Sequence, residues 1–308
     1  MRAEPRSGDL RILACQLAIP EMSAAGERDA HLQQSAEKVR HALSSHAPVD
    51  LVVLPELSSI DYSRRAFENL SALAEPLEGP SFECWRALAR DFGTHVAFGF
   101  PRRAGDAVHI SMAVVAPSGT LLGHYDKLHL AQYGASMEKD YFTIGQHLFV
   151  FEIRGVRIAP IICYDIRIPE LPRTLVVKHG VDLILHSGAY YRDPSFYSWH
   201  QFAVSRAIEN QVFMLSLNRA GACYGNSIFC PPWMDGEREP TLLAEHDEVF
   251  ALLTLDPSEI TQARERYSFL RDRLESYDLP VIGVSEAADE AQPSLRPRLV
   301  PSPLEREG

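Results

Sequence analysis

Three side chains of complementary chemistry directly follow predicted strands in this sequence: a carboxylate, an ammonium group and a thiol. Glu56 follows the run LVVLP, Lys127 follows the segment LLGHYD, and Cys163 follows VRIAPII. Reacting groups gather at strand ends in α/β sheets, so we expect these three to converge. A cysteine attacks as the thiolate and needs a base or a positive charge close to it at neutral pH. The set therefore predicts nucleophilic catalysis at a carbonyl carbon.

Each residue has a role in such a reaction. Glu56 can accept the thiol proton, pass it to the leaving amine and later activate water. Lys127, together with the backbone N–H of Tyr164, can stabilise the negative charge that develops on the substrate oxygen. Taken singly, a strand-end cysteine is more often a buried core residue. A Cys–His enzyme with His129 or His186 as the base is the other catalytic interpretation of the thiol.

Alternating strands and helices must position these residues. Short apolar runs predict strands, and the 3.6-residue spacing of apolar positions predicts helices. The expected strands span 11–17, 51–54, 95–100, 108–116, 120–125, 148–153, 156–162, 182–186, 212–218 and 249–255; the expected helices span 28–45, 81–91, 169–178, 195–210 and 257–267. Turns at 117–119 and 154–155 predict two hairpins. This order is typical of an α/β fold with mixed sheets.

The bulk composition excludes several classes of protein. The chain has 308 residues, of which 46% are apolar, and a formal net charge of -11, which argues against a nucleic-acid partner. No apolar run has membrane-spanning length and no signal-peptide pattern opens the sequence, so we expect a cytoplasmic protein without membrane partners. The five cysteines lack ligand-like spacing, which predicts reduced thiols and no metal site. A Pro-rich tail is expected at 285–308, after one domain at 1–284.

The motifs around these residues resemble those of the carbon–nitrogen hydrolase (nitrilase) superfamily, in its amidase-like branch. Four motifs agree in order and spacing over roughly residues 10 to 280: LVVLPEL at 51–57, KLHL at 127–130, CYDIRIPEL at 163–171, and AIENQ at 207–211 leading to Asn218-Arg219. The resemblance implies that Glu56, Lys127 and Cys163 form a Glu-Lys-Cys triad, and that Glu138 lies near the substrate and the attacking water. It also implies a four-layer α-β-β-α sandwich with two mixed sheets, assembled as a homodimer or a higher homo-oligomer.

The resemblance implies hydrolysis of a small carboxamide to a carboxylate and ammonia, with no metal or organic cofactor. An N-carbamoyl amine or amino-acid hydrolase, cleaving a ureido group with the same triad, is the first alternative. A nitrilase and a catalytically silent binding protein are the others. The sequence departs from the family pattern at 189–192 and between Tyr224 and Asp235, two stretches that border the pocket in the family. Substrate preference is expected to depend on them.

Four tyrosines and three other polar residues complete the expectations. Tyr62, Tyr164, Tyr190 and Tyr191 are expected to bind the substrate. His129 is expected to be a structural partner within its loop. Arg167 and Glu170, three residues apart at a helix start, could bind a substrate carboxylate, but they are expected instead to pair with each other.

Overall fold

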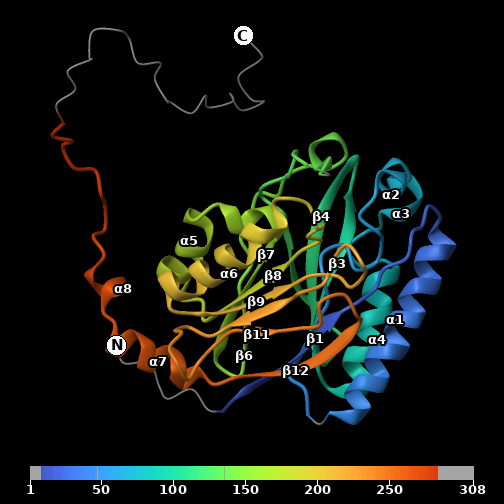
Figure 1. The fold of residues 1–308 in the computed structure, drawn as a ribbon. Helices are drawn as coiled ribbons and strands as arrows, with labels where there is room; N and C mark the ends of the chain where they lie inside the picture. The colour runs from blue at the N-terminus through green and yellow to red at the C-terminus, as the bar shows by residue number, and fades with distance from the viewer. Residues whose placement is uncertain (1–7, 47, 135, 284–308) are drawn as a thin grey trace, which may run out of the picture. The chain divides into compact units, whose positions relative to one another are not determined.

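Two six-stranded β-sheets form the centre of the fold (Figure 1). The structure is a computed structural model that describes residues 8–46, 48–134 and 136–283. The chain divides into two units, Met1–Arg271 and Asp272–Gly308, and both sheets belong to the first. In the second unit, the described residues 273–283 contain no helix or strand. The predicted tail at 285–308 lies outside the described residues.

The first sheet has the strand order β12-β1-β2-β3-β4-β5. Strands β1, β2 and β3 are parallel, whereas β4, β5 and β12 add to them in antiparallel fashion. Their bounds are Leu10–Gln16 for β1, Leu51–Val53 for β2, His95–Ala104 for β3, Ala107–Val115 for β4, Leu121–Asp126 for β5 and Val249–Leu255 for β12. The predicted hairpin at 117–119 is confirmed between β4 and β5.

The second sheet has the order β11-β10-β9-β8-β7-β6 and the same plan. Its middle strands β7, β8 and β9 are parallel, with antiparallel strands on both sides. The bounds are Phe151–Ile153 for β6, Val156–Ile162 for β7, Leu183–Ser187 for β8, Phe213–Leu217 for β9, Ile228–Cys230 for β10 and Thr241–Leu242 for β11. Both sheets are mixed, as the sequence predicted.

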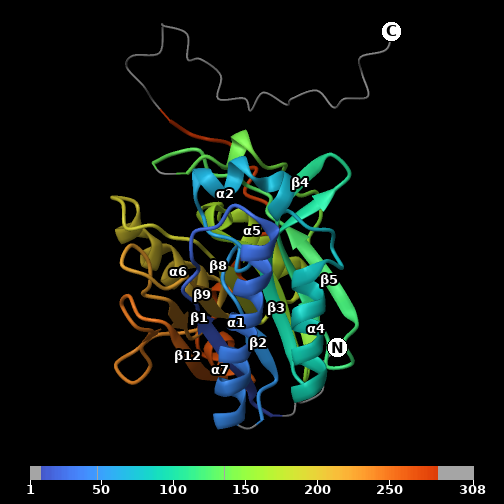
Figure 2. The ribbon, with the colours of Figure 1, turned by 90° about the vertical axis from the view of Figure 1, so that its right-hand side faces the viewer.

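Helices cover the outer face of each sheet (Figures 1 and 2). Helices α1 (Ala25–Ser45) and α4 (Pro80–Phe92) pack on the first sheet, and α5 (Glu170–His179) and α6 (Phe196–Asn210) pack on the second. The remaining elements are α2 (Arg64–Glu68), α3 (Leu70–Leu73), α7 (Pro257–Arg266), α8 (Phe269–Asp272) and the 3₁₀ turns η1 (Glu138–Asp140) and η2 (Cys163–Arg167). The layers therefore follow the predicted α-β-β-α order.

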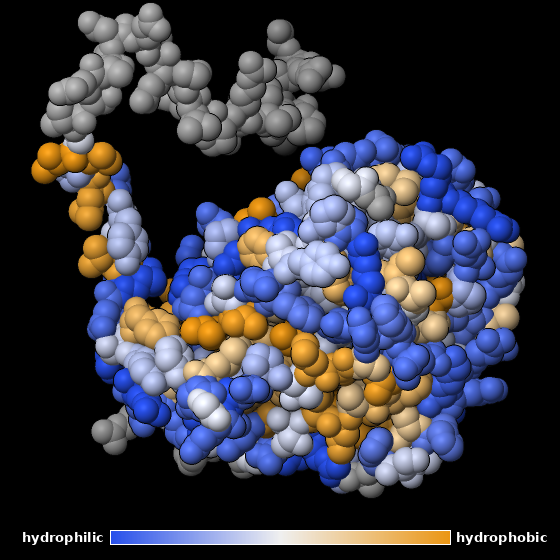
Figure 3. All heavy atoms as spheres, viewed as in Figure 1, coloured by the Kyte–Doolittle hydropathy of each residue, from blue (hydrophilic) through white to orange (hydrophobic). Residues whose placement is uncertain are grey.

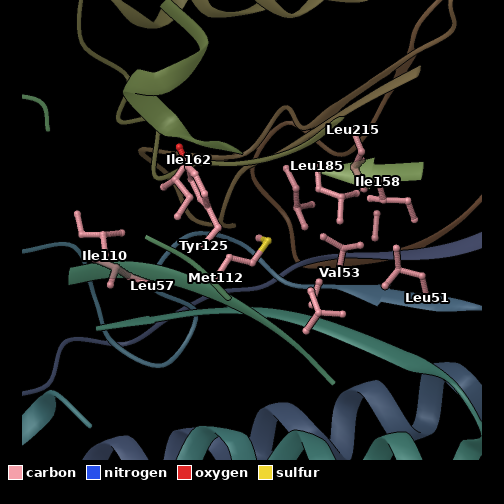
Figure 4. Packing of buried hydrophobic residues seen from close by; sticks show 14 of the residues in the cluster. Leu51, Val53, Leu57, Ile110, Met112, Tyr125, Ile158, Ile162, Leu185 and Leu215 are labelled. Atoms are coloured by element: carbon pink, nitrogen blue, oxygen red, sulfur yellow. The ribbon is translucent and has the colours of Figure 1, made fainter. Parts of the chain in front are cut away.

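The main core lies between the two sheets (Figure 4). Leu51 and Val53 of β2 face Ile158, Leu185 and Leu215 of the second sheet. The residue between them in β2, Val52, packs instead against the outer helices. Both faces of these strands are buried, which explains why they read as continuous apolar runs rather than as alternating ones. Each buried aliphatic side chain contributes about 1.5–3 kcal/mol to stability.

Some apolar surface remains outside this core. Hydrophobic side chains reach the surface along the edge strand β12, whose first four residues, 249–252, are half-buried (Figure 3).

Among the described residues, no helix combines the length and the apolar character that crossing a membrane requires. All five cysteines are free thiols.

Candidate active site

Cys163 begins the turn η2, directly after β7. Its φ of 45° lies in the left-handed region, which is uncommon for a residue other than glycine and is often found at functional sites. The turn places the thiol in the wall of a cavity of about 180 Å³. The carbonyl oxygen of Cys163 accepts two hydrogen bonds, from the Tyr190 hydroxyl at 2.9 Å and from His186 Nε2 at 3.0 Å. The strained residue is therefore fixed by its own backbone oxygen.

The second of these donors, His186, is itself oriented by a chain of hydrogen bonds. A carbonyl oxygen can only accept, so the His186 proton is on Nε2 and Nδ1 accepts from Ser216 Oγ at 2.6 Å. Ser216 Oγ in turn accepts a hydrogen bond of 2.7 Å from Trp199 Nε1. Burial lowers the pKa of His186 to about 4, so the ring is neutral. His186 thus holds the backbone of Cys163 and does not serve as the base of a Cys–His pair.

Asp165 braces the same turn from the other side. One of its carboxylate oxygens accepts from the Ile162 amide at 3.0 Å and from the Tyr125 hydroxyl at 2.7 Å. The other accepts from the His129 amide at 2.9 Å and from His129 Nδ1 at 2.7 Å. The sequence analysis predicts a partner for His129 within its own loop, whereas the structure pairs it with Asp165 of η2. Through Asp165, the end of β7 is tied to the segment that follows β5.

Behind the thiol lie three charged side chains that are fully buried and linked by hydrogen bonds. Lys127 Nζ lies 2.9 Å from Glu56 Oε1 and 2.7 Å from Glu138 Oε1, and all three residues are 0% exposed. Glu138 also accepts hydrogen bonds from the Tyr62 hydroxyl at 2.7 Å and from the Ala131 amide at 2.8 Å. One oxygen of each carboxylate and the sulfur of Cys163 all lie within 4.8 Å of one another. The structure thus brings together the four residues predicted to be catalytic.

Two glycines allow the backbone to approach closely enough for this arrangement. Glu56 lies in the turn that follows β2, and a Cβ at Gly99 would lie only 2.5 Å from the carbonyl oxygen of Pro55. Gly145 donates its amide to the Lys127 carbonyl at 2.8 Å, and a Cβ there would lie 2.2 Å from the Asp126 carbonyl oxygen. Any larger residue at either position would push apart the segments that carry Glu56 and Lys127.

Burial and mutual charge set the protonation states. Burial raises the pKa of Glu56 to about 7; Lys127 opposes the rise and Glu138 adds to it. Burial, and then the negative charge of Glu56, raise the pKa of the Cys163 thiol. Burial lowers the pKa of Lys127, but the charges of Glu138 and Glu56 outweigh this and raise that pKa well above its ordinary value. At rest the site therefore holds a thiol, an ammonium group and a carboxylate able to exchange a proton near neutral pH.

The walls of the cavity come from loops far apart in the sequence. The residues that line it are Tyr62, Ala131, Tyr133, Ser136, Met137, Cys163, Ala189, Tyr190, Tyr191, Asp193, Ser195 and Tyr224. Three of the four predicted substrate tyrosines are among them. The fourth, Tyr164, is not, and its ring packs against Tyr133 at 5.5 Å between centroids. The sequence analysis missed Tyr133, Asp193 and Tyr224, although the stretch of unusual sequence after β8 indicated where new wall residues would lie.

The expected ion pair between Arg167 and Glu170 is wrong. The two residues form no ion pair in the described part of the chain, because η2 ends at Arg167 and the separate helix α5 begins at Glu170. The Arg167 guanidinium packs instead over the rings of Tyr133 and Phe202, at 5.5 and 5.0 Å from their centroids. Its Nη1 donates to Ser198 Oγ at 3.3 Å.

Two groups of side chains have the spacing of metal ligands, and in each a cation of the protein is already present. In the group formed by Glu56, Glu138 and Cys163, the Lys127 ammonium contacts both carboxylates. In the group formed by His124, Asp126 and His147, Arg102 donates to both oxygens of Asp126, at 2.9 and 2.7 Å. In both groups, therefore, the carboxylates already have a cationic partner from the protein.

Comparisons with known proteins identify a matching family model, related sequences and a similar fold. The family model "Carbon-nitrogen hydrolase" matches residues 11–264. An (R)-stereoselective amidase of a Pseudomonas species is 30% identical over 80% of this chain and 88% of its own length. A 2-oxoglutaramate amidase of Bacillus subtilis is 33% identical over 62% of this chain and 72% of its own length. The crystal structure of Saccharomyces cerevisiae Nit3, a member of branch 10 of the nitrilase superfamily, superposes with a TM-score of 0.74 at 24% identity, over 86% of this chain and 97% of Nit3.

Proposed function

This chain belongs to the carbon–nitrogen hydrolase family, as a hydrolase of non-peptide carbon–nitrogen bonds in its amidase-like branch, and we propose that it releases ammonia from a small carboxamide through an acyl-enzyme on Cys163. The observation that carries the proposal is the buried chain of Glu56, Lys127 and Glu138 behind a cysteine in the wall of a cavity. A thiol, a base and a fixed cation within one small volume are the groups that acyl transfer requires.

The first half-reaction forms the acyl-enzyme. Sγ of Cys163 bonds to the carbonyl carbon while the thiol proton passes to the Glu56 carboxylate. The electron pair of the C=O bond moves to oxygen, where Lys127 and the Tyr164 amide stabilise the charge. Glu56 then gives the proton to the amide nitrogen as the C–N bond breaks and ammonia leaves. A pKa of about 7 suits Glu56 for both transfers at neutral pH.

The second half-reaction restores the enzyme. A water molecule attacks the thioester carbon, and Glu56 takes one of its protons. Glu138 positions this water and the substrate, because its carboxylate is held by Lys127, by the Tyr62 hydroxyl and by the Ala131 amide. When the tetrahedral intermediate collapses, the C–S bond breaks and the proton returns from Glu56 to the sulfur. A carboxylic acid is released and the thiol is regenerated.

The alternatives differ in substrate or in catalytic groups. An N-carbamoyl compound would present its ureido carbonyl to the same triad, and this is the second candidate function. A nitrilase activity is less favoured, because nitrilases in the family usually differ in the residues after the cysteine. A Cys–His enzyme is not supported, because His129 contacts Asp165 and His186 contacts the carbonyl oxygen of Cys163. A silent binding protein would have no need for four assembled catalytic groups.

The test is ammonia release from short aliphatic amides, ω-amides of dicarboxylic acids, N-carbamoyl compounds and nitriles. Wild type and Cys163→Ala are assayed in parallel. We expect one class to be hydrolysed by wild type and none by the variant. Turnover that survives in Cys163→Ala, or a panel on which wild type is silent, would overturn the proposal.

We also propose that the hydrolase domain spans residues 1–284, that the protein acts in the cytoplasm, and that it assembles as a homodimer. The family resemblance supports the homodimer and, over roughly residues 10 to 280, the domain. Light scattering on the purified chain measures the assembly, and a mass equal to one copy would contradict the dimer.

A further inference from the structure

The cavity wall carries one carboxylate and no basic side chain among the described residues that line it. The carboxylate belongs to Asp193, which is half-buried. Its Oδ1 accepts the Ser195 amide at 2.7 Å, whereas no described residue donates a hydrogen bond or forms an ion pair to Oδ2. A Cβ at position 134 would lie 2.7 Å from this second oxygen, so the carboxylate lies close against the backbone of Gly134. The wall therefore presents a negative charge that no described residue neutralises.

None of the cations discussed for this site lines the cavity. Lys127 is bound by two carboxylates. The Arg192 guanidinium donates to the carbonyl oxygens of Tyr224 and Glu245, at 3.0 and 2.8 Å, and to Asn226 Oδ1 at 3.0 Å. The Arg167 guanidinium packs over the rings of Tyr133 and Phe202, and its Nε and Nη2 are buried without a hydrogen-bond partner among the described residues, but Arg167 does not line the cavity. A carboxylate at the far end of a substrate would therefore face Asp193 without a balancing positive charge in the cavity wall, which disfavours its binding.

The rest of the wall suits a cation. Tyr133, Tyr191 and Tyr224 line the same cavity as Asp193, and the rings of Tyr191 and Tyr224 meet edge to face at 5.7 Å between centroids. Ammonium groups are attracted to aromatic faces as well as to carboxylates. The cavity, of about 180 Å³, is smaller than the 300–1,000 Å³ typical of sites for drug-sized ligands, so the substrate must be short.

We propose that the substrate is a short amide, or N-carbamoyl compound, whose end opposite the scissile bond is an ammonium group bound by Asp193 and the surrounding tyrosines. This rests on the proposed amidase function and adds the class of substrate to it. Asp193 is then the residue that selects the charge of the substrate.

A purely structural role for Asp193 is the competing explanation. Its carbonyl oxygen accepts the Phe196 amide at 3.0 Å and its Oδ1 accepts the Ser195 amide, so the residue helps to start helix α6. This role uses the backbone and one side-chain oxygen, and it requires no negative charge. Asp193→Asn keeps the Oδ1 acceptor and removes only the charge, so it separates the two roles.

The experiment compares substrates that are matched in length. 4-Aminobutanamide and pentanamide differ by an ammonium group in place of a methyl group, and succinamate places a carboxylate at the same end. We expect kcat/KM of wild type to be at least about tenfold higher for 4-aminobutanamide than for pentanamide, and lowest for succinamate, a difference of about 1.4 kcal/mol. In Asp193→Asn the ratio of the first two should fall by about tenfold. Glu78→Gln, which removes an equal charge from an exposed position, should keep the ratio of wild type.

Calorimetric binding of the same three compounds to Cys163→Ala measures the preference without turnover. The inference would be overturned if wild type and Cys163→Ala favoured pentanamide or succinamate. It would also be overturned if Asp193→Asn kept the wild-type ratio of kcat/KM between 4-aminobutanamide and pentanamide. Ammonia release that persists in Cys163→Ala would instead overturn the proposed function. Thermal unfolding of Asp193→Asn establishes that helix α6 still forms.

Discussion

The charged groups behind Cys163 and the wall of the cavity are built in opposite ways. The charged groups, here called the floor of the site, are Glu56, Lys127 and Glu138; they are completely buried, and Lys127 contacts both carboxylates. The wall consists largely of loop residues such as Tyr133 and Tyr191, which are 39% and 44% exposed. A buried charge tolerates no change in its partners, whereas an exposed ring does. The chemistry of the site is therefore fixed by the interior, and its selectivity is open to change at the surface.

Removing the cation of the floor should have the largest effect. Lys127→Met leaves Glu56 and Glu138 buried without a counter-charge, which costs about 3–5 kcal/mol of stability and abolishes turnover. Urea unfolding and ammonia release measure the two effects. Lys38→Met is the control, because Lys38 pairs with Glu248 at 2.8 Å but is 45% exposed, and it should cost no more than about 1 kcal/mol. Equal losses in the two variants would contradict the contrast.

Replacing the base should stop the chemistry and leave the fold. Glu56→Gln keeps an oxygen that can accept from Lys127 but cannot take the thiol proton. We expect kcat to fall by about 10²- to 10⁴-fold, the usual contribution of a positioned base. Single-turnover kinetics at saturating amide measure the drop. A kcat within a factor of two of wild type would show that another group accepts the proton.

Loosening the Cys163 backbone should have an intermediate effect. His186→Phe removes one of the two donors to the Cys163 carbonyl and leaves the Tyr190 hydroxyl. A small displacement of the thiol should lower kcat by up to about 10²-fold. The pH profile separates this positioning role from a role as base, because the acidic limb should keep its midpoint in His186→Phe. A lost limb would assign the proton transfer to His186.

Titration of Glu56 should change kcat/KM by about tenfold per pH unit on the acidic side of its pKa. The raised pKa of Glu56, about 7, means that the protonated, inactive acid predominates below that pH. We therefore expect kcat/KM to rise with pH up to about 7 and then to level off until other groups titrate. The limb should be absent from the residual rate of Glu56→Gln. A kcat/KM that is flat from about pH 5 to about pH 8, the range in which Glu56 should titrate, would contradict this assignment.

The smallest effect should come from the wall. Tyr191→Phe removes one exposed hydroxyl, and the loss of a hydrogen bond at such a position costs about 0.5–1.5 kcal/mol. We expect KM for a neutral amide to rise by no more than about tenfold, with kcat close to that of wild type. A fall in kcat as large as that of Glu56→Gln would place this hydroxyl in the chemistry and remove the distinction between floor and wall.

The sequence predicted the floor far better than the wall, for a physical reason. Strands such as β2 and β7 are buried on both faces, so they appear as apolar runs whose ends can be located, and Glu56 and Cys163 follow those ends directly. Wall residues lie on loops, where the direction of a side chain depends on contacts with distant segments. Asp193 beside Gly134 is such a contact. The same holds for Tyr164, whose ring packs against Tyr133 of another loop and does not itself line the cavity.

The raised pKa of Cys163 also affects how long the protein survives chemically. Peroxides and alkylating agents react with the thiolate, and burial keeps this sulfur protonated until a substrate is bound and Glu56 accepts the proton. Burial raises the pKa of Cys15 and Cys230 in the same way. We therefore expect the free enzyme to react slowly with peroxides and alkylating agents, because the burial that makes catalysis depend on Glu56 also keeps the sulfur protonated.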